Sequence, residues 1–340
     1  MLHTTTPADA RRRSLCLALT AAAAAGTGPL FAAEPPSNEL KIYGNLSTLE
    51  LAPVLLAVDR FYKAPARVQQ GGITSLYGQP GDLPNLVGIG MSDLATNSET
   101  QGLRYLVQHP GLRIIFTVSE GLYRIVARRS AGIGTLADLK GKRVGTQPRT
   151  SSAYYLDRML RRVGLTEADV KTVPFVAASP VPLSQMTGAF LKGELDAATI
   201  WEPEMQRAQD ALGADAIEFY EPDGYREQFC LYSTDEKLKD PQLRPRIVAF
   251  LRALVQASEI VRSKPQEAWP LVVKAGKYDA AIVERSWRHH SYPGTLLPKV
   301  VEMMVEEDVW VAKETGRAPR SRREIETLVD FAPLQEALRG

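Results

Sequence analysis

Cysteine and histidine are scarce in this chain, which contains two cysteines and four histidines among 340 residues. Cys16 lies in an apolar run near the N-terminus, which leaves Cys230 as the one cysteine of the globular part. An internal disulfide therefore cannot form there, and stability has to come from the core. His289 and His290 are adjacent, and neighbouring side chains on a helix point about 100° apart. We expect both histidines to lie at the surface and expect no metal site.

Motifs for several common catalytic chemistries are also absent. The sequence contains no G-x-x-x-x-G-K-[ST], no G-x-S-x-G, no H-E-x-x-H and no C-x-x-C pattern. Phosphate transfer, ester hydrolysis and zinc chemistry therefore lack a recognisable motif. We expect neither an enzyme nor a bound cofactor.

Residues 1–33 have the pattern of an export leader. Three arginines at positions 11–13 precede an apolar run over residues 15–25, which is too short to span a bilayer as a stable helix. Small residues just before Glu34 offer a cleavage point. The adjacent arginines admit twin-arginine export as well as the Sec route, and the choice between them stays open. We expect a periplasmic mature protein without a membrane anchor.

Neither sign of charge is in excess once this leader is removed. The chain has 41 Lys and Arg and 39 Asp and Glu, and the leader contains three arginines and one aspartate, which leaves 38 of each sign. Nucleic acids and anionic membranes favour proteins with a basic excess, so we expect neither as a partner. The length and the 44% hydrophobic content suit a globular protein of two lobes.

The stretch DLKGKRVGTQPRTSSAYYLD, residues 138–157, predicts a strand that leads into a helix. The helix would begin at Thr150, Ser151 and Ser152, and hydroxyl residues are preferred at a helix start. The free amide groups there bind anions, and open α/β sheets bind ligands at this edge. With Arg149 beside it, this helix start is a candidate oxyanion site. An ordinary capped strand-to-helix junction is the alternative.

Three segments, ADLKGKRVG, TSSAYYLDRMLRRVGL and LKGELDAATIWEP, resemble the periplasmic solute-binding proteins of ABC transporters in the nitrate/sulfonate/taurine (NMT1-like) family, and the similarity extends over roughly residues 38–330. The resemblance implies an α/β fold, the type II periplasmic-binding-protein clamshell. Each of its two lobes has a mixed, mainly parallel sheet flanked by helices, and two hinge crossings join them. It also implies a monomer that delivers a small organic anion to an inner-membrane ABC permease. The pyrimidine synthases of thiamine biosynthesis share this fold but carry a cysteine-rich stretch that this chain lacks.

From the resemblance we assign residues 38–122 and 229–340 to lobe one, with the C-terminal helices, and residues 123–228 to lobe two. A strand beginning at Leu112 is predicted to be interrupted at residues 119–121, before the first crossing. Residues 71–90 depart from the family pattern because glycine and proline interrupt an expected helix, so we predict a short helix and a loop there.

A weak internal repeat relates residues 90–99 to residues 193–202 through the shared pattern G-x-x-D-x-A-T-x-x-E. We interpret each copy as a strand begun by the aspartate and a helix begun near the glutamate, where an acid favours the helix dipole. Two lobes of like topology facing a shared cleft would produce such a repeat.

Twelve residues are candidate ligand contacts. The resemblance places the loop after the first strand in the cleft, and Trp201 could stack on a ring. Glu99 and Glu202 would repel a bare anion if they face the cleft and would be uninformative if they pair with arginines. The candidates are Asn45, Ser47, Thr48, Asn97, Glu99, Glu120, Arg149, Thr150, Ser151, Ser152, Trp201 and Glu202.

The predicted ligand is a sulfonate, nitrate, or an aromatic or aliphatic acid, with amine-bearing acids close behind. A ligand sensor that feeds a membrane receptor and an enzyme on the same fold are the alternative functions.

Overall fold

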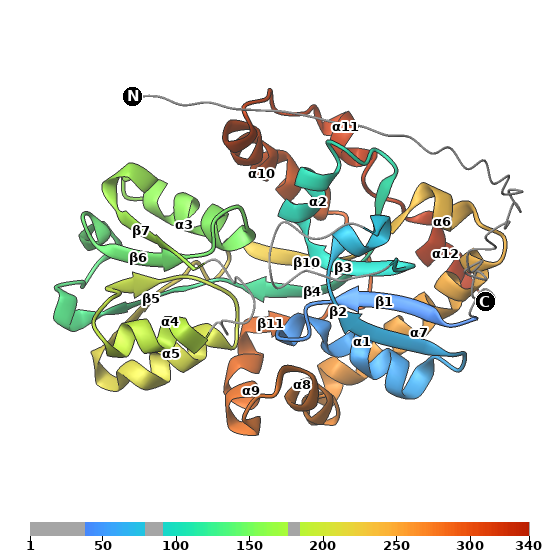
Figure 1. Cartoon of the computed structure of the whole chain (residues 1–340), viewed down its shortest axis with the longest axis horizontal. Coiled ribbons are helices and arrows are strands. Elements are labelled where there is room, and N and C mark those ends of the chain that lie inside the picture. Colours follow the sequence, from blue (N-terminus) through green and yellow to red (C-terminus); the bar gives the residue numbers. More distant parts are fainter. Residues whose placement is uncertain (1–37, 79–90, 176–183, 340) are drawn as a thin grey trace, which may run out of the picture. The chain divides into compact units, whose positions relative to one another are not determined.

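The computed structural model describes residues 38–78, 91–175 and 184–339. Over these ranges the chain forms two β-sheets with flanking helices (Figure 1). The short helix that we predicted after residue 71 is present as a helical turn at Ile73–Tyr77, and most of the loop predicted after it lies outside the described residues. None of the helices described is long and apolar enough to cross a membrane.

The first sheet has six strands in the order β11-β4-β10-β3-β1-β2. β1 pairs in parallel with β2 and β3, whereas β10 is antiparallel to β3 and β4. Ile114, Ile115 and Phe116 of β4 are fully buried, as expected for a strand covered on both faces. The strands are β1 (Leu40–Gly44), β2 (Ala66–Gln70), β3 (Leu94–Ser98), β4 (Leu112–Leu122), β10 (Arg226–Thr234) and β11 (His290–Ser291).

The second sheet has five strands in the order β7-β6-β8-β5-β9. β6 is parallel to β7 and β8, and β5 is antiparallel to β8 and β9. Helix α3 covers one face, while α4 and α5 cover the other (Figure 1). These elements are β5 (Ile125–Arg128), β6 (Arg143–Thr146), α3 (Ser151–Arg161), β7 (Lys171–Pro174), α4 (Ser184–Leu191), β8 (Ala197–Ala198), α5 (Glu204–Leu212) and β9 (Ala216–Phe219).

The remaining helices accompany the first sheet. Helix α7 packs against α1 and α12, and α10 packs against α2. The apolar spacing that predicted α7 corresponds to a buried face that includes Ile247, Phe250 and Leu254. The helices are α1 (Ala52–Leu56), α2 (Glu99–Tyr105), α6 (Asp235–Lys239), α7 (Leu243–Ser263), α8 (Trp269–Gly276), α9 (Ala280–Ser286), α10 (Val300–Thr315), α11 (Arg322–Glu326) and α12 (Ala332–Arg339).

Strand β4 is continuous, so the interruption predicted at residues 119–121 is wrong. Glu120 is paired with Gln228 of β10 on one side and with Ser291 of β11 on the other. Pairing on both sides keeps the segment extended although glycine and glutamate have low strand propensity.

Two connections join the sheets. The first runs from the end of β4 at Leu122 to the start of β5 at Ile125, and the second runs from the end of β9 at Phe219 to the start of β10 at Arg226. Residues 226–228, which we had assigned to lobe two, are already paired with the first sheet.

The internal repeat has a structural counterpart in the two sheets. Oδ2 of Asp93 accepts a hydrogen bond from the backbone N of Lys41, at the start of β1, over 2.8 Å. Oδ2 of Asp196 accepts the equivalent bond from the backbone N of Arg143, at the start of β6, also over 2.8 Å. Each aspartate thus fastens the start of its strand to the parallel neighbour. The glutamates differ slightly, because Glu99 begins α2 directly whereas α5 begins two residues after Glu202.

One contiguous set of buried apolar side chains reaches into both sheets. Ile42 of β1 and Leu231 of β10 belong to it together with Ile125 of β5 and Val144 of β6, and all four are fully buried. A smaller set surrounds Phe190 of α4. Removal of this apolar surface from water is the main term that stabilises the fold.

Candidate functional site

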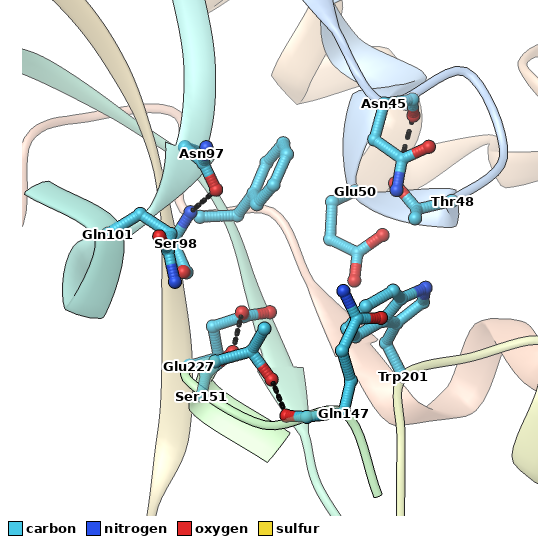
Figure 2. A pocket seen from close by; sticks show the side chains of 12 residues that line it. Asn45, Thr48, Glu50, Asn97, Ser98, Gln101, Gln147, Ser151, Trp201 and Glu227 are labelled. Carbon is cyan, nitrogen blue, oxygen red and sulfur yellow. Dashed lines mark hydrogen bonds between the residues drawn. The ribbon is translucent and has the colours of Figure 1, made fainter. Parts of the chain in front are cut away.

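A pocket lies where polar segments of the first sheet meet the start of α3 (Figure 2). Its space is about 410 Å³, including the part open to solvent. The lining residues come from the loop after β1, the junction of β3 and α2, the turn before α3, the segment after β8, and β10. They are Asn45, Thr48, Glu50, Asn97, Ser98, Gln101, Gln147, Thr150, Ser151, Trp201, Glu227 and Phe229.

The loop after β1 supplies three of these residues. The side chain of Asn45 accepts a hydrogen bond from the backbone N of Ser47 over 3.1 Å, and the Thr48 hydroxyl donates to the carbonyl of Asn45 over 3.1 Å. Asn45 and Thr48, two of the predicted ligand contacts, line the pocket. Ser47 does not, and its carbonyl accepts a hydrogen bond from the hydroxyl of Tyr278. Glu50, which we did not predict, lines the pocket one turn further on.

The three hydroxyls at the start of α3 are used differently from one another. Thr150 donates to the carbonyl of Gln147 over 2.7 Å, and Ser151 donates to Oε1 of Glu227 over 2.6 Å. Ser152 donates to the carbonyl of Thr199 over 2.7 Å and lies outside the pocket lining. Thr150 is the N-cap residue, but its side chain makes no capping bond to the helix. These hydroxyls are therefore bound to protein acceptors, and the anion site at the free amides of the helix start stays a prediction.

Arg149 lies outside this lining, on a neighbouring cavity with Arg104 and Arg317. It has a positive φ of 63°, and its carbonyl accepts a hydrogen bond from Nε2 of Gln101 over 2.7 Å. The sequence had suggested a guanidinium beside the helix start. The turn conformation places the residue on the other cavity.

Glu99 and Glu202, the two repeat glutamates, are buried in the protein rather than in the pocket lining. Glu99 accepts hydrogen bonds from the Tyr225 hydroxyl over 2.9 Å and from the backbone N of Gln228 over 3.0 Å. Glu202 accepts from Nε of Arg124 over 2.8 Å. The side chains of Arg124 and Glu202 are both almost fully buried. Pairing with an arginine was one of the two alternatives for Glu202, and it is the one observed.

Glu120 also lies outside the pocket lining. Its carboxylate pairs with Lys299 and accepts hydrogen bonds from Nε2 of Gln228 over 2.7 Å and from the Ser291 hydroxyl over 3.0 Å. The bonds from these donors lower the pKa of Glu120 although burial opposes them. This residue joins β4 to its two neighbours.

Two other carboxyl groups, those of Glu50 and Glu227, line the pocket instead. Glu50 is 2% exposed and Glu227 is 4% exposed. Burial raises the pKa of Glu227 well above its ordinary value, and the neighbouring charges of Glu50 and Glu99 raise it further. Figure 2 shows the Glu50 side chain directed into the space that the labelled residues surround. The described lining of the pocket therefore carries two acidic side chains.

Several buried polar atoms of the lining have no hydrogen-bond partner within the described part of the chain. They are Oε2 of Glu50, Nδ2 of Asn97, Oε1 and Nε2 of Gln147, and Nε1 of Trp201. Oδ1 of Asn97 accepts from the backbone N of Ser98 over 2.9 Å, which fixes the orientation of that amide. Buried polar groups in proteins are almost always paired, so these atoms are available to a ligand or to water.

Cationic side chains are absent from the lining that the structure describes. Residues 79–90 and 176–183, which interrupt the described ranges, contain no lysine or arginine in the sequence. A bare anion in the pocket would therefore meet carboxyl groups without a compensating cation from these segments.

His289 and His290 are buried, so the predicted surface position is wrong. His290 begins β11, and its pairing with Gly121 of β4 draws the segment inward. Nε2 of His290 lies 3.5 Å from Oε1 of Glu50, behind the pocket wall. Burial lowers the pKa of His289 to about 3, and the nearby charge of Arg124 adds to this effect. No group of three or more potential ligands within the described ranges is arranged to hold a metal ion.

Sequence reasoning missed Glu50 and Glu227, and of the two only Glu50 carried a usable signal. Glu50 lies between Leu49 and Leu51 in an otherwise apolar segment, whereas Glu227 lies between Arg226 and Gln228. A carboxylate inside an apolar run is seldom buried unless it has a partner or a function. Gln147, Ser98 and Gln101 carried no comparable signal.

A comparison with known protein families identifies the family of this chain. The family model described as NMT1/THI5 like matches residues 74–268, more than half of the 340 residues. The chain belongs to this family. The resemblance drawn from the sequence motifs is thereby confirmed.

The NMT1/THI5-like chain is 27% identical over 213 residues to a putative thiamine biosynthesis protein of Haemophilus influenzae. That match covers 60% of the chain and 64% of the relative, so the chain spans less than two thirds of the relative's length. Among solved structures, the periplasmic aliphatic sulphonate-binding protein of Escherichia coli matches with a TM-score of 0.66 at 18% identity, over 86% of this chain and 92% of that one.

The desulfurization enzyme DSZB matches with a TM-score of 0.60 at 15% identity, over 88% of this chain and 99% of that one. At such identities the likeness to solved structures shows the fold alone. The predicted α/β fold of periplasmic binding proteins is confirmed.

Proposed function

We propose that this protein is an extracytoplasmic solute-binding protein that captures a small organic solute in the pocket and delivers it to an inner-membrane ABC importer. The observation that carries the proposal is the convergence of polar side chains from both sheets on one pocket, with buried atoms that no described residue satisfies. Two connections between the sheets suit a hinge, and hinge closure is a common way to enclose a ligand.

The leader-like residues 1–33 support an extracytoplasmic location, because a cleaved export signal would release the mature chain at Glu34. Sec and twin-arginine export both fit this proposal. The mature protein would act as a monomer, as the family resemblance implies, and its protein partner would be the permease.

The proposed lobes follow the two sheets. Residues 38–122 together with the C-terminal part make up lobe one, and residues from 123 to the start of β10 make up lobe two. The proposed ligand contacts among the sequence candidates are those that line the pocket: Asn45, Thr48, Asn97, Thr150, Ser151 and Trp201. Of the other six candidates, Ser47 would support the pocket through the bond from its backbone N to Asn45, and the rest lie outside the lining.

The alternative of an enzyme on this fold deserves comparison because DSZB has a similar fold. In this chain the Cys230 thiol lies on β10, outside the pocket lining, and donates to the carbonyl of Gln228 over 3.3 Å. Burial raises the pKa of this thiol well above its ordinary value, which disfavours the reactive thiolate. The buried, unreactive thiol outside the lining favours binding of a solute over its chemical conversion.

The first experiment is identification of the natural ligand. The mature chain would be purified from the periplasm without unfolding, and native mass spectrometry would reveal any bound small molecule. We expect a stoichiometric solute that is unchanged after prolonged incubation. Added back to refolded protein at a thousand times its dissociation constant, it should stabilise the fold by about 4 kcal/mol.

The Gln147→Ala variant tests whether the solute occupies this pocket, because Gln147 offers two unpartnered polar atoms to it. We expect at least a tenfold weaker affinity in isothermal titration calorimetry, since a lost hydrogen bond leaves the ligand group unpaired. Gln335→Ala, at an exposed position of α12, is the matched control and should bind normally. Absence of any retained solute, or its chemical conversion by the protein, would contradict the proposal.

A further inference from the structure

We propose that the ligand of this pocket is an organic base, which presents a protonatable, hydrogen-bond-donating nitrogen to Glu50 and Glu227 and an apolar face to Trp201 and Phe229. This inference rests on the proposed function, because it takes the pocket to be the solute site. It replaces the bare anion that the family resemblance implied with a ligand of the opposite character.

The carboxyl of Glu50 is the principal reason. Its Oε2 is buried and has no hydrogen-bond partner among the described residues, while its Oε1 lies 3.5 Å from Nε2 of His290. A carboxylate oxygen can only accept hydrogen bonds while it is ionised. A buried acceptor left unpaired is costly, so the complementary ligand group is a donor.

Glu227 provides a second carboxyl on the same pocket. Its Oε1 accepts from the hydroxyls of Ser151 over 2.6 Å and Tyr123 over 3.3 Å, which hold the side chain in place. These two hydroxyls also lie 2.9 Å from each other, so the carboxyl is part of a fixed network. A positively charged group between Glu50 and Glu227 would relieve the repulsion that two buried carboxyls exert on each other.

The remaining unpartnered atoms define the rest of the ligand. Nδ2 of Asn97 and Nε1 of Trp201 are donors, and the Gln147 amide offers both a donor and an acceptor. A suitable ligand therefore carries at least one acceptor beside its basic nitrogen. The rings of Trp201 and Phe229 provide apolar lining, which a flat or ring-shaped body would fill.

The charges around the pocket agree with this assignment. The described lining contains two carboxyl groups and no lysine, arginine or histidine. Arginine and lysine are the usual partners of oxyanions in proteins, and the hydroxyls at the start of α3 donate to protein acceptors. The described lining therefore has donors to orient a ligand but no cationic side chain to neutralise an acid.

The test uses ring compounds of matched size and different charge. Benzamidine and benzylamine are the basic probes, benzamide is the neutral probe, and benzoate and benzenesulfonate are the acidic probes. Binding of each to the ligand-free mature protein would be measured at pH 7.5 by calorimetry and thermal unfolding. We expect the basic probes to bind at least tenfold more tightly than the acidic ones.

Two variants assign the preference to the carboxyl groups. Glu50→Gln and Glu227→Gln keep the shape of each side chain but remove its charge, and each should weaken the basic probes at least tenfold. Glu284→Gln, at an exposed position of α9, is the matched control and should leave binding unchanged. If one variant folds poorly, the preference of the wild-type protein for basic over acidic probes still tests the ligand class.

Tighter binding of benzoate or benzenesulfonate than of the bases would overturn the ligand class, and so would a panel in which neither base binds. The identification of a retained solute tests the proposed function separately. A retained acid would therefore leave the solute-binding function intact while this inference fails.

Discussion

Glu99 is a carboxyl group whose ionisation is set by its burial. It is fully buried near Glu307 of α10, and burial raises the pKa of Glu99 to about 7 although the bonds from Gln228 and Tyr225 oppose the shift. Glu307 makes no hydrogen bond of ordinary length within the described residues. We therefore attribute its own raised pKa to burial and to the charge of Glu99. The pKa values of both acids therefore lie above that of an exposed glutamate.

This burial predicts a pH dependence of stability. In the unfolded chain Glu99 would ionise near pH 4.5, so between roughly pH 4.5 and pH 7 the folded state holds more protons than the unfolded state. Folding therefore becomes less favourable as the pH rises through that window, by up to about 3 kcal/mol from Glu99. Urea unfolding of wild type and Glu99→Gln at several pH values should show a flatter dependence in the variant.

Wild type and Glu99→Gln have to be compared because His289 changes the stability of the fold with pH in the opposite direction. Its lowered pKa means that stability is lost as the pH falls below about 6.5, and this contribution is the same in both proteins. Identical pH profiles for wild type and Glu99→Gln would show that Glu99 ionises normally in the folded state.

At the scale of elements, Arg124 joins β5 to α5 and β9. It is 1% exposed, and it donates to Glu202 over 2.8 Å and to Glu218 of β9 over 2.7 Å. Its NH2 group also donates to Gln206 of α5 over 3.3 Å. Burial raises the pKa of Glu202, although the arginine opposes this effect. The positive charge of Arg124 offsets the desolvation cost of the buried Glu202 carboxylate.

Arg124→Met should therefore destabilise the protein by about 3–5 kcal/mol, because it leaves Glu202 buried without its cation. Urea unfolding at pH 7.5 would measure the loss. Arg285→Met breaks an exposed pair with Asp210 and should cost only about 0–1 kcal/mol. Equal costs for the two variants would mean that burial does not distinguish these ion pairs.

At the scale of the molecule, the two sheets share one contiguous apolar core. Polar contacts reinforce it, because Ser151 of α3 bonds to Glu227 of β10 and Tyr225 bonds to Glu99 of α2. Trp310 of α10 also packs edge-on against Tyr154 of α3, with ring centroids 5.6 Å apart. Both apolar and polar contacts therefore connect the two sheets.

We therefore expect the mature chain to unfold in one cooperative transition, with the same urea midpoint by far-UV circular dichroism and by tryptophan fluorescence. The fluorescence reports on both sheets, because Trp201 follows β8 while Trp269 and Trp287 lie among the helices of the first sheet. Two separated midpoints would show that the sheets unfold independently.

The fold class was predicted from the resemblance of three segments to a known family. Most of the elements and the repeat were predicted from local patterns: apolar spacing, hydroxyl and acidic residues at helix starts, and aspartates such as Asp93 and Asp196 that bond to the neighbouring strand. Interactions of this kind are specified by a few neighbouring residues, so they can be read from short segments.

Which carboxyl groups line the pocket depends on the three-dimensional packing. Glu50 and Glu227 are 177 positions apart, and both line the pocket because β1 and β10 lie on either side of β3 in the first sheet. Glu99 and Glu202 were the more prominent acids in the sequence, but Tyr225 and Arg124 bind them elsewhere. A side chain's function depends on which distant partner satisfies it, and that partner is set by packing rather than by sequence spacing.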